Sequence, residues 1–82
     1  MKREELIGIK LECIGTVEPY ESEFIVGKIY VIEGDTFQGY PVFIAEDEFD
    51  WAVFPEDYVD LDDMIVQLNN NTNGRFKLAK GE

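Results

Sequence analysis

The strongest constraint on this chain is that its apolar residues come in short runs separated by turn-forming residues. The longest apolar runs are four or five residues, and glycine, proline or acidic residues interrupt them. Runs of this length, when rich in β-branched and aromatic residues, are typical of strands. Five such runs fall within about fifty residues, so the sequence predicts an all-β, antiparallel barrel or a small sandwich.

The first expected strand covers residues 9–13, where Ile9, Leu11 and Cys13 alternate with polar residues at the period of a half-buried strand. The other expected strands are residues 28–33, 41–45, 51–54 and 58–61. Residues 16–23 have no periodicity and predict a long irregular loop. Residues 34–39 and 46–50 predict turns, and residues 55–57 predict a tight helical turn.

We expect a single domain over residues 9–68. Residues 1–8 predict a polar lead-in, and residues 62–68 predict a short helix with acids in its first turn or a last edge strand. The Asn-rich stretch and basic tail over residues 69–82 predict a flexible linker and a frayed or docked end. The apolar runs are too short for a signal peptide or a membrane span. The single cysteine fits a reducing setting, so we expect a cytoplasmic protein.

The composition excludes several kinds of site. Cys13 is the single cysteine and there is no histidine, which rules out an internal disulfide, a zinc site and a nucleophilic triad. We expect Cys13 to be a buried structural thiol. The glycines are scattered and form no phosphate-binding loop. The sequence therefore predicts a protein that is not an enzyme, with no catalytic residue, cofactor or metal site.

Charge is the second informative feature. The formal net charge is −11, and residues 11–65 contain 15 acidic residues and one basic residue, Lys28. This argues against direct binding to DNA, RNA or anionic lipid, because phosphate contacts need Lys and Arg. Two interpretations remain open. The acidic surface keeps the protein dispersed in solution, or it is the working surface and faces a basic partner.

Two short segments carry a resemblance to a known family. Residues 54–59, with the sequence FPEDYV, resemble the end of an SH3 domain, where a strand runs into Phe-Pro, a 3₁₀ turn and Tyr-Val. Residues 23–28, with the sequence EFIVGK, are similar to that family's diverging turn, and Gly27 allows the positive φ that such a turn needs. The resemblance implies a five-stranded antiparallel SH3-like barrel with a short C-terminal helix or edge strand. On this register the inward residues are Tyr30, Ile32, Val42, Ile44, Phe54 and Val59.

The peptide-binding groove of that family is incomplete here. Pro55 and Tyr58 match it, and Tyr20 in the long loop could contribute. However, the third expected strand opens at Pro41, Trp51 opens the fourth strand instead, and the first strand has no aromatic residue. A proline-rich ligand needs a flat aromatic platform, so peptide recognition is an alternative function. The short acidic chain also resembles small SH3-like proteins encoded by bacteriophages and prophages.

The acidic turn at residues 46–50 has two interpretations. Its four carboxylates could hold a hard cation, but they lack the alternating order of a calcium loop, so a solvated hairpin turn is favoured. Trp51, next to this turn, is either an exposed interface anchor or a cover for the open end of the barrel. The candidate partner-binding residues are Glu46, Asp47, Glu48, Asp50, Trp51, Glu56, Asp57 and Tyr58.

We therefore expect a non-enzymatic protein-interaction module, an inhibitor or regulator that docks on a basic surface of a partner protein. In its strongest form the carboxylates over residues 46–63 imitate DNA phosphates and occupy a nucleic-acid-binding site. The alternative is an assembly subunit that joins a larger complex through exposed strand edges or residues 62–78, and it would self-associate through Phe76, Leu78 and residues 64–68. The oligomeric state and the partner's identity are left open.

Overall fold

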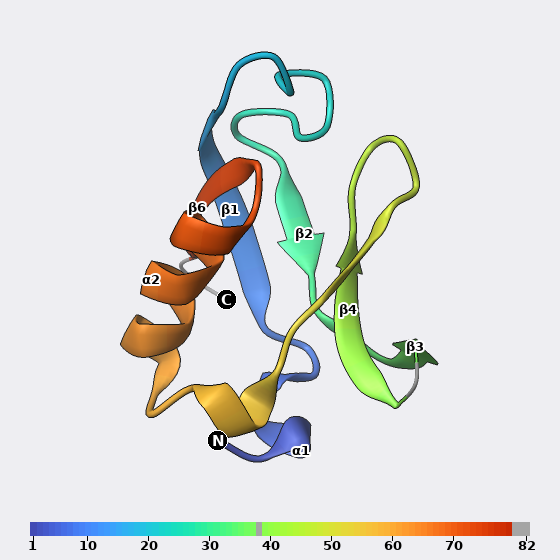
Figure 1. Cartoon of the computed structure of the whole chain (residues 1–82), viewed down its shortest axis with the longest axis vertical. Helices are drawn as coiled ribbons and strands as arrows, with labels where there is room; N and C mark the ends of the chain where they lie inside the picture. The colour runs from blue at the N-terminus through green and yellow to red at the C-terminus, as the bar shows by residue number, and fades with distance from the viewer. Residues whose placement is uncertain (38, 80–82) are drawn as a thin grey trace.

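The computed structural model describes residues 1–37 and 39–79. Two antiparallel three-stranded sheets, in the orders β2-β1-β6 and β3-β4-β5, make up most of the fold, and helix α2 lies beside β6 (Figure 1). The expected β-rich, antiparallel fold is confirmed, although the strands of the described residues do not close into one barrel. The elements in chain order are α1 (Arg3–Leu6), β1 (Lys10–Thr16), β2 (Ile29–Val31), β3 (Glu33–Phe37), β4 (Tyr40–Ile44), β5 (Asp50–Ala52), the 3₁₀ helix η1 (Pro55–Asp57), α2 (Leu61–Asn71) and β6 (Gly74–Leu78).

Strand β1 is the centre of the first sheet. Leu11 lies opposite Tyr30 of β2, and Cys13 lies opposite Phe76 of β6. Leu11 and Cys13 are fully buried, as the alternation over residues 9–13 predicts. Burial raises the pKa of the Cys13 thiol, since the thiolate is disfavoured away from water. Cys13 is therefore a structural residue of the core.

The long loop between β1 and β2 is held by backbone bonds at its second half. Gly27 has φ of +92°, as the sequence predicts for a sharp turn into a strand. The Gly27 amide donates to the Cys13 carbonyl at 2.8 Å, and the Cys13 amide donates to the Lys28 carbonyl at 3.0 Å. These bonds orient the preceding residues so that Phe24 points into the core, where it is 1% exposed.

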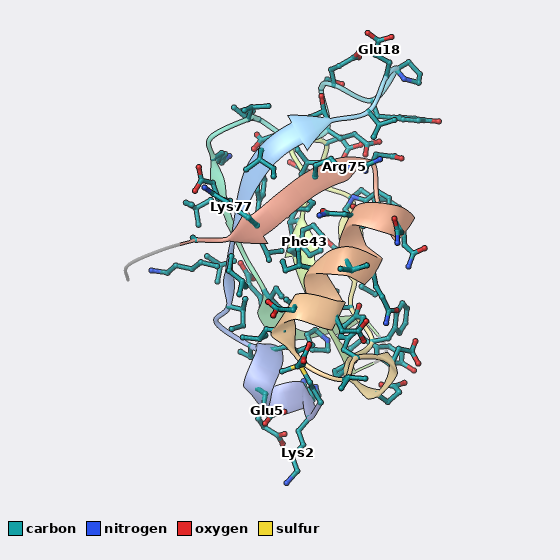
Figure 2. All side chains as sticks on the ribbon, turned by 90° about the vertical axis from the view of Figure 1, so that its left-hand side faces the viewer. Lys2, Glu5, Glu18, Phe43, Arg75 and Lys77 are labelled. Atoms are coloured by element: carbon teal, nitrogen blue, oxygen red, sulfur yellow. The ribbon has the colours of Figure 1, made fainter. Side chains whose placement is uncertain are left out.

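An aromatic cluster forms the centre of the core. The Phe24 ring meets the rings of Phe76 and Tyr30 edge to face, with centroids 5.0 and 5.2 Å apart. Phe43 of the second sheet lies 5.4 Å from Phe76 and 6.0 Å from Phe24, and Figure 2 shows it in the interior behind β6 and α2. Such edge-to-face contacts between rings are favourable beyond the area they bury. The cluster therefore joins the two sheets.

Gly74 permits this close aromatic packing at the start of β6. A Cβ atom at this position would lie 2.7 Å from the Phe76 ring and 2.8 Å from the Phe24 ring. Heavy atoms do not approach each other this closely without displacement. Glycine is thus required where β6 passes over the cluster.

The structure has no strand at residues 58–61, so the predicted fifth strand is wrong. Helix α2 begins there instead, because Asp60 caps it: its carboxylate accepts from the Asp63 amide at 2.8 Å. The Asp63 carboxylate accepts from the amide of Val59, the residue before the cap, at 2.9 Å. Side-chain hydrogen bonds to backbone amides of this kind favour the start of a helix over an extended segment. Of the two alternatives for residues 62–68, the helix is correct.

The predicted linker and tail over residues 69–82 also differ from the structure. Residues 69–71 form the last turn of α2, and Gly74–Leu78 forms β6, which occupies the place beside β1. The side chain of Asn69 explains why an Asn-rich segment is ordered. Its Oδ1 accepts from the Phe76 amide at 2.8 Å and its Nδ2 donates to the Phe76 carbonyl at 3.2 Å. Residues 80–82 lie outside the described residues.

Part of the predicted inward set is also wrong. Tyr30, Ile32 and Val42 are buried as expected, but Ile44, Phe54 and Val59 are exposed, Val59 at 84%. The prediction for Phe54 is wrong by one position in the in–out alternation, because Val53 is the buried residue of that segment. A shift of one residue in an extended segment exchanges its two faces. The expected polar lead-in over residues 1–8 also contributes to the core, since Leu6 of α1 is fully buried.

We predict that Asn69→Ala lowers the free energy of unfolding by about 1 to 3 kcal/mol, because it leaves the Phe76 amide and carbonyl without partners. The matched control is Asn70→Ala at the next, exposed position of the same helix. Both substitutions bring the same gain in helix propensity, so their difference isolates the two hydrogen bonds. Urea unfolding of the three proteins measures it, and equal stabilities of the two variants would contradict the role of Asn69.

Candidate functional site

A cleft of about 570 Å³ lies between the β4–β5 hairpin and helix α2. One wall comes from the hairpin and the segment that follows it, and the other wall comes from the second half of α2. Most of the cleft surface is apolar, and no Lys or Arg is among the residues that line it. The lining residues are Glu48, Phe49, Asp50, Trp51, Ala52, Phe54 and Tyr58 on one side and Gln67, Leu68, Asn71 and Thr72 on the other.

The turn between β4 and β5 sets the position of the aromatic wall. The Asp47 carboxylate accepts from the Phe49 amide at 3.1 Å, and Glu48 takes a positive φ of 68°. The chain thereby reverses, and the Ala45 amide donates to the Phe49 carbonyl at 3.0 Å. This places the Phe49 ring edge to face on Trp51, with centroids 4.9 Å apart. The hairpin thus presents two adjoining aromatic rings to the cleft.

Trp51 lies between the core and the cleft. Its ring is half-buried and sits 6.4 Å from Phe24, so one part of it packs on the aromatic cluster. Its indole N–H is buried and has no acceptor within the described residues. A buried donor without an acceptor raises the free energy of the folded state. Trp51 therefore covers part of the core and also lines the recess, and its role as an interface anchor stays a prediction.

Tyr58 lines the cleft from its lower end without presenting its hydroxyl to solvent. The side chain is 6% exposed, and the hydroxyl accepts from the Phe54 amide at 3.3 Å. Burial raises the pKa of the Tyr58 hydroxyl, because the phenolate is disfavoured out of water. Phe54, in turn, packs edge to face on Tyr40 at 4.9 Å. Tyr58 therefore supports the wall of the cleft.

Glu46, a predicted site residue, has a structural role away from the cleft. Its carboxylate pairs with the Lys28 ammonium at 2.5 Å and accepts from the Tyr30 hydroxyl at 2.8 Å. These two partners hold the pKa of Glu46 below its ordinary value, with Lys28 as the larger cause. The Glu46 carboxylate joins the hairpin to the loop that precedes β2.

The eight predicted site residues thus divide into two groups. Glu48, Asp50, Trp51 and Tyr58 line the cleft together. The others do not line it. They are Glu46 in its pair with Lys28, Asp47 in the turn, and Glu56 and Asp57 exposed on η1.

Several cleft residues were outside the predicted site. Phe49 and Phe54 come from the same hairpin and its exit, where the aromatic content alone was a signal. Gln67, Leu68, Asn71 and Thr72 come from α2, which the sequence did not place opposite the hairpin. The Gln67 amide donates to the Asp57 carbonyl at 2.9 Å, which links α2 to η1 and fixes the width of the cleft at this end.

Three further searches gave negative results. Within residues 1–37 and 39–79, no group of three or more His, Cys, Asp and Glu side chains is placed to hold a metal ion. No helix in the same ranges has the length and apolar character needed to cross a membrane. No family model matches the chain, and searches of curated proteins and of solved structures find no match either.

We predict an alkaline loss of stability that depends on Tyr30. Burial is the main cause that raises the pKa of Tyr30 from its ordinary value of 10 to about 12. A raised folded-state pKa means that the contribution is complete below pH 10 and is lost as the pH rises through about 12. Wild-type stability should therefore fall over this interval, and that of Tyr30→Phe should fall less.

Urea unfolding at pH 8, 10 and 11.5 measures this difference. The control is Tyr20→Phe, because Tyr20 is an exposed tyrosine in the loop before β2. This variant should keep the full alkaline loss. At pH 8, Tyr30→Phe should be less stable than wild type by about 1 to 3 kcal/mol, since Glu46 and the Ile25 amide both lose a partner. The same alkaline slope in both variants would contradict the assignment to Tyr30.

Proposed function

We propose that this protein is a non-enzymatic interaction module that docks on a basic surface of a partner protein and inserts an apolar side chain of that partner into the cleft. The observation that carries the proposal is the lining of the cleft. The aromatic rings of Phe49, Trp51 and Phe54 and the side chain of Leu68 line the recess, and the charged side chains among the lining residues are the carboxylates of Glu48 and Asp50. A recess of this kind suits an apolar side chain with Lys or Arg beside it.

The charge of the whole chain supports the same partner. A formal net charge of −11 attracts a basic surface and accelerates association at low ionic strength. The buried apolar contact then supplies affinity that salt does not screen. An apolar recess with an acidic rim therefore explains both the aromatic wall and the charge.

The strong form of the sequence hypothesis, a row of carboxylates that imitates DNA phosphates, receives less support. Several members of the row bond within the chain and so serve the fold. Glu46 pairs with Lys28, Asp47 accepts from the Phe49 amide, and Asp60 and Asp63 cap α2. A regular array of free charges over residues 46–63 is thus interrupted, which favours docking through the cleft over imitation of a duplex.

The assembly alternative also receives little support from the residues first considered for it. Phe76, Met64 and Leu68 are buried in the core, and Ile65 and Leu78 pack against it, which leaves Val66 as the exposed apolar residue of the set. Apolar residues that are already packed do not supply a surface for self-association.

We further propose that the fold is an SH3-like barrel extended by α2. Ile32 alone separates β2 from β3, so one bent strand contributes to both sheets. The strand order, followed from β5 through β4, β3, β2 and β1 to β6, is then that of an SH3-like barrel, and the 3₁₀ helix η1 has the expected place after β5. Helix α2 is the addition, and it creates one wall of the cleft.

Trp51 is the single tryptophan, so its fluorescence reports binding in the cleft directly. We predict that nine-residue peptides with one central Leu, Phe or Trp flanked by Lys and Arg bind the protein. Peptides with Asp and Glu as the flanking residues should not bind. Fluorescence titration measures the affinities, with calorimetry for the peptides that contain Trp. Equal binding of the acidic peptides would contradict the proposal.

Two variants test the cleft itself. Phe49→Ala removes an exposed wall residue and should weaken the basic peptide about tenfold or more. Val59→Ala, at an exposed residue that does not line the cleft, is the control and should bind as wild type does.

Two double variants test the carboxylates of Glu48 and Asp50 at the rim of the cleft. Glu48→Gln with Asp50→Asn should weaken binding and reduce its salt dependence more than Glu4→Gln with Glu21→Gln, which removes the same charge at exposed carboxylates elsewhere. Equal effects of the two pairs would show that net charge alone drives the association.

A further inference from the structure

The free edge of β5 borders the cleft. Strand β5 is the outer strand of the sheet β3-β4-β5, so β4 is its neighbour on one side. Along β4, the Ala45 amide donates to the Phe49 carbonyl at 3.0 Å, and the Val53 amide donates to the Pro41 carbonyl at 2.9 Å. In an antiparallel pair the bonded residues alternate with unbonded ones. Residues 49, 51 and 53 therefore direct their backbone groups to β4.

The intervening residues, Asp50 and Ala52, direct their backbone N–H and C=O groups to the opposite side. Both residues line the cleft, with Leu68 and Thr72 of α2 on the far wall. In the part of the chain that the structure describes, no hydrogen bond joins these groups to another residue. Unpaired strand groups of this kind are a template for another strand.

At the other edge beside α2, a side chain of the helix already bonds to the strand. Strand β6 is the outer strand of the sheet β2-β1-β6, and α2 packs against it. The Asn69 side chain accepts from the Phe76 amide and donates to the Phe76 carbonyl, as a neighbouring strand would. Figure 1 shows α2 on the β6 side of the molecule, with the segment that follows β5 crossing toward it. Helix α2 thus satisfies the outward backbone groups of Phe76 on β6 and leaves the edge of β5 accessible through the cleft.

We propose that the free edge of β5 binds an extended segment of the basic partner protein by strand addition. This inference rests on the proposed function and specifies how the partner is held. The backbone of the segment bonds to Asp50 and Ala52. One of its apolar side chains packs against Phe49 and Trp51, and a Lys or Arg at an alternate position lies beside Glu48 or Asp50.

Charge selects this occupant over a second copy of the chain. Pairing of β5 with the β5 strand of another copy would bring Glu48 and Asp50 of both copies together, and each copy carries a formal net charge of −11. Like charges opposite each other on paired strands are destabilising. A segment with Lys or Arg meets the opposite condition, because the same carboxylates then neutralise its charge.

The test uses a seven-residue peptide in which Lys and Val alternate. Two derivatives carry backbone N-methyl groups, one at the odd and one at the even positions. Strand addition directs the amides of one set toward β5 and those of the other set away from it. We expect one derivative to bind at least tenfold more weakly than the parent peptide and the other to bind within about twofold of it. Equal affinity of the two derivatives would overturn strand addition.

A protein variant gives an independent result. Ala52→Pro removes the N–H that faces the cleft and no bond to β4, a position where an edge strand tolerates proline. It should weaken the parent peptide at least tenfold, whereas Val59→Ala, at an exposed residue that does not line the cleft, should bind as wild type does. Equal affinities in the two variants would count against the inference. Circular dichroism confirms that both variants are folded.

Amide hydrogen exchange of the wild-type protein measures how well the backbone amides at the same edge are protected, without a substitution. In the free protein, the Asp50 and Ala52 amides should exchange faster than those of Trp51 and Val53. The parent peptide should slow them at least tenfold, and an unchanged rate in the bound state would overturn the proposal.

These outcomes separate the inference from the proposed function. If the parent peptide changes Trp51 fluorescence but the two N-methyl derivatives bind equally, the cleft binds a basic segment and strand addition is wrong. If neither the parent peptide nor the basic peptides described above bind, the proposed function itself is wrong. A dimer of the free protein in sedimentation that Ala52→Pro abolishes would assign the edge to a second copy.

Discussion

Edge-to-face packing of aromatic rings around Phe24 is the interaction on which the rest of the structure depends. Phe24 comes from the loop between β1 and β2, yet its ring contacts Tyr30 and Phe76 of one sheet and Phe43 and Trp51 of the other. Full burial of such a side chain stabilises the fold by about 1.5 to 3 kcal/mol, and each well-oriented ring pair adds about 0.5 to 1.5 kcal/mol. With no disulfide available, this contact joins the two sheets and also orders the long loop.

Helix α2 determines where the surface of the protein is open. A helix packs against a strand through side chains and does not continue the backbone ladder, so it leaves strand edges without partners unless a side chain supplies them. The Asn69 amide does so for Phe76 on β6. Among the described residues, no side chain forms a hydrogen bond with the outward backbone groups of Asp50 and Ala52. The cleft and the free edge of β5 follow from this unequal coverage, and the turn between β4 and β5 places the aromatic wall beside them.

The acidic residues have two roles that composition does not separate. Asp60 and Asp63 cap α2, Asp47 bonds within the hairpin turn, and Glu46 is held by Lys28 and Tyr30. Others, such as Glu48 and Asp50, remain exposed beside the aromatic rings. A charge that is already hydrogen-bonded within the chain contributes to the long-range field but is less available to contact a partner directly. The functional argument therefore concerns the few carboxylates at the rim of the cleft.

The sequence by itself determined the β-rich fold, the turn at Gly27, the burial of Cys13 and the 3₁₀ turn at Pro55, because each depends on local periodicity or on the backbone preference of one residue. It also indicated that Trp51 and the neighbouring acids lie together, since they adjoin in the chain. The tertiary structure decided the rest. Whether residues 58–61 form a strand or the start of a helix, and whether Val53 or Phe54 is buried, depends on packing against distant segments. The order of residues 69–78 depends on the bonds between Asn69 and Phe76, and the cleft depends on α2 lying opposite the hairpin. These are contacts across space, and a pattern of neighbouring residues does not encode them.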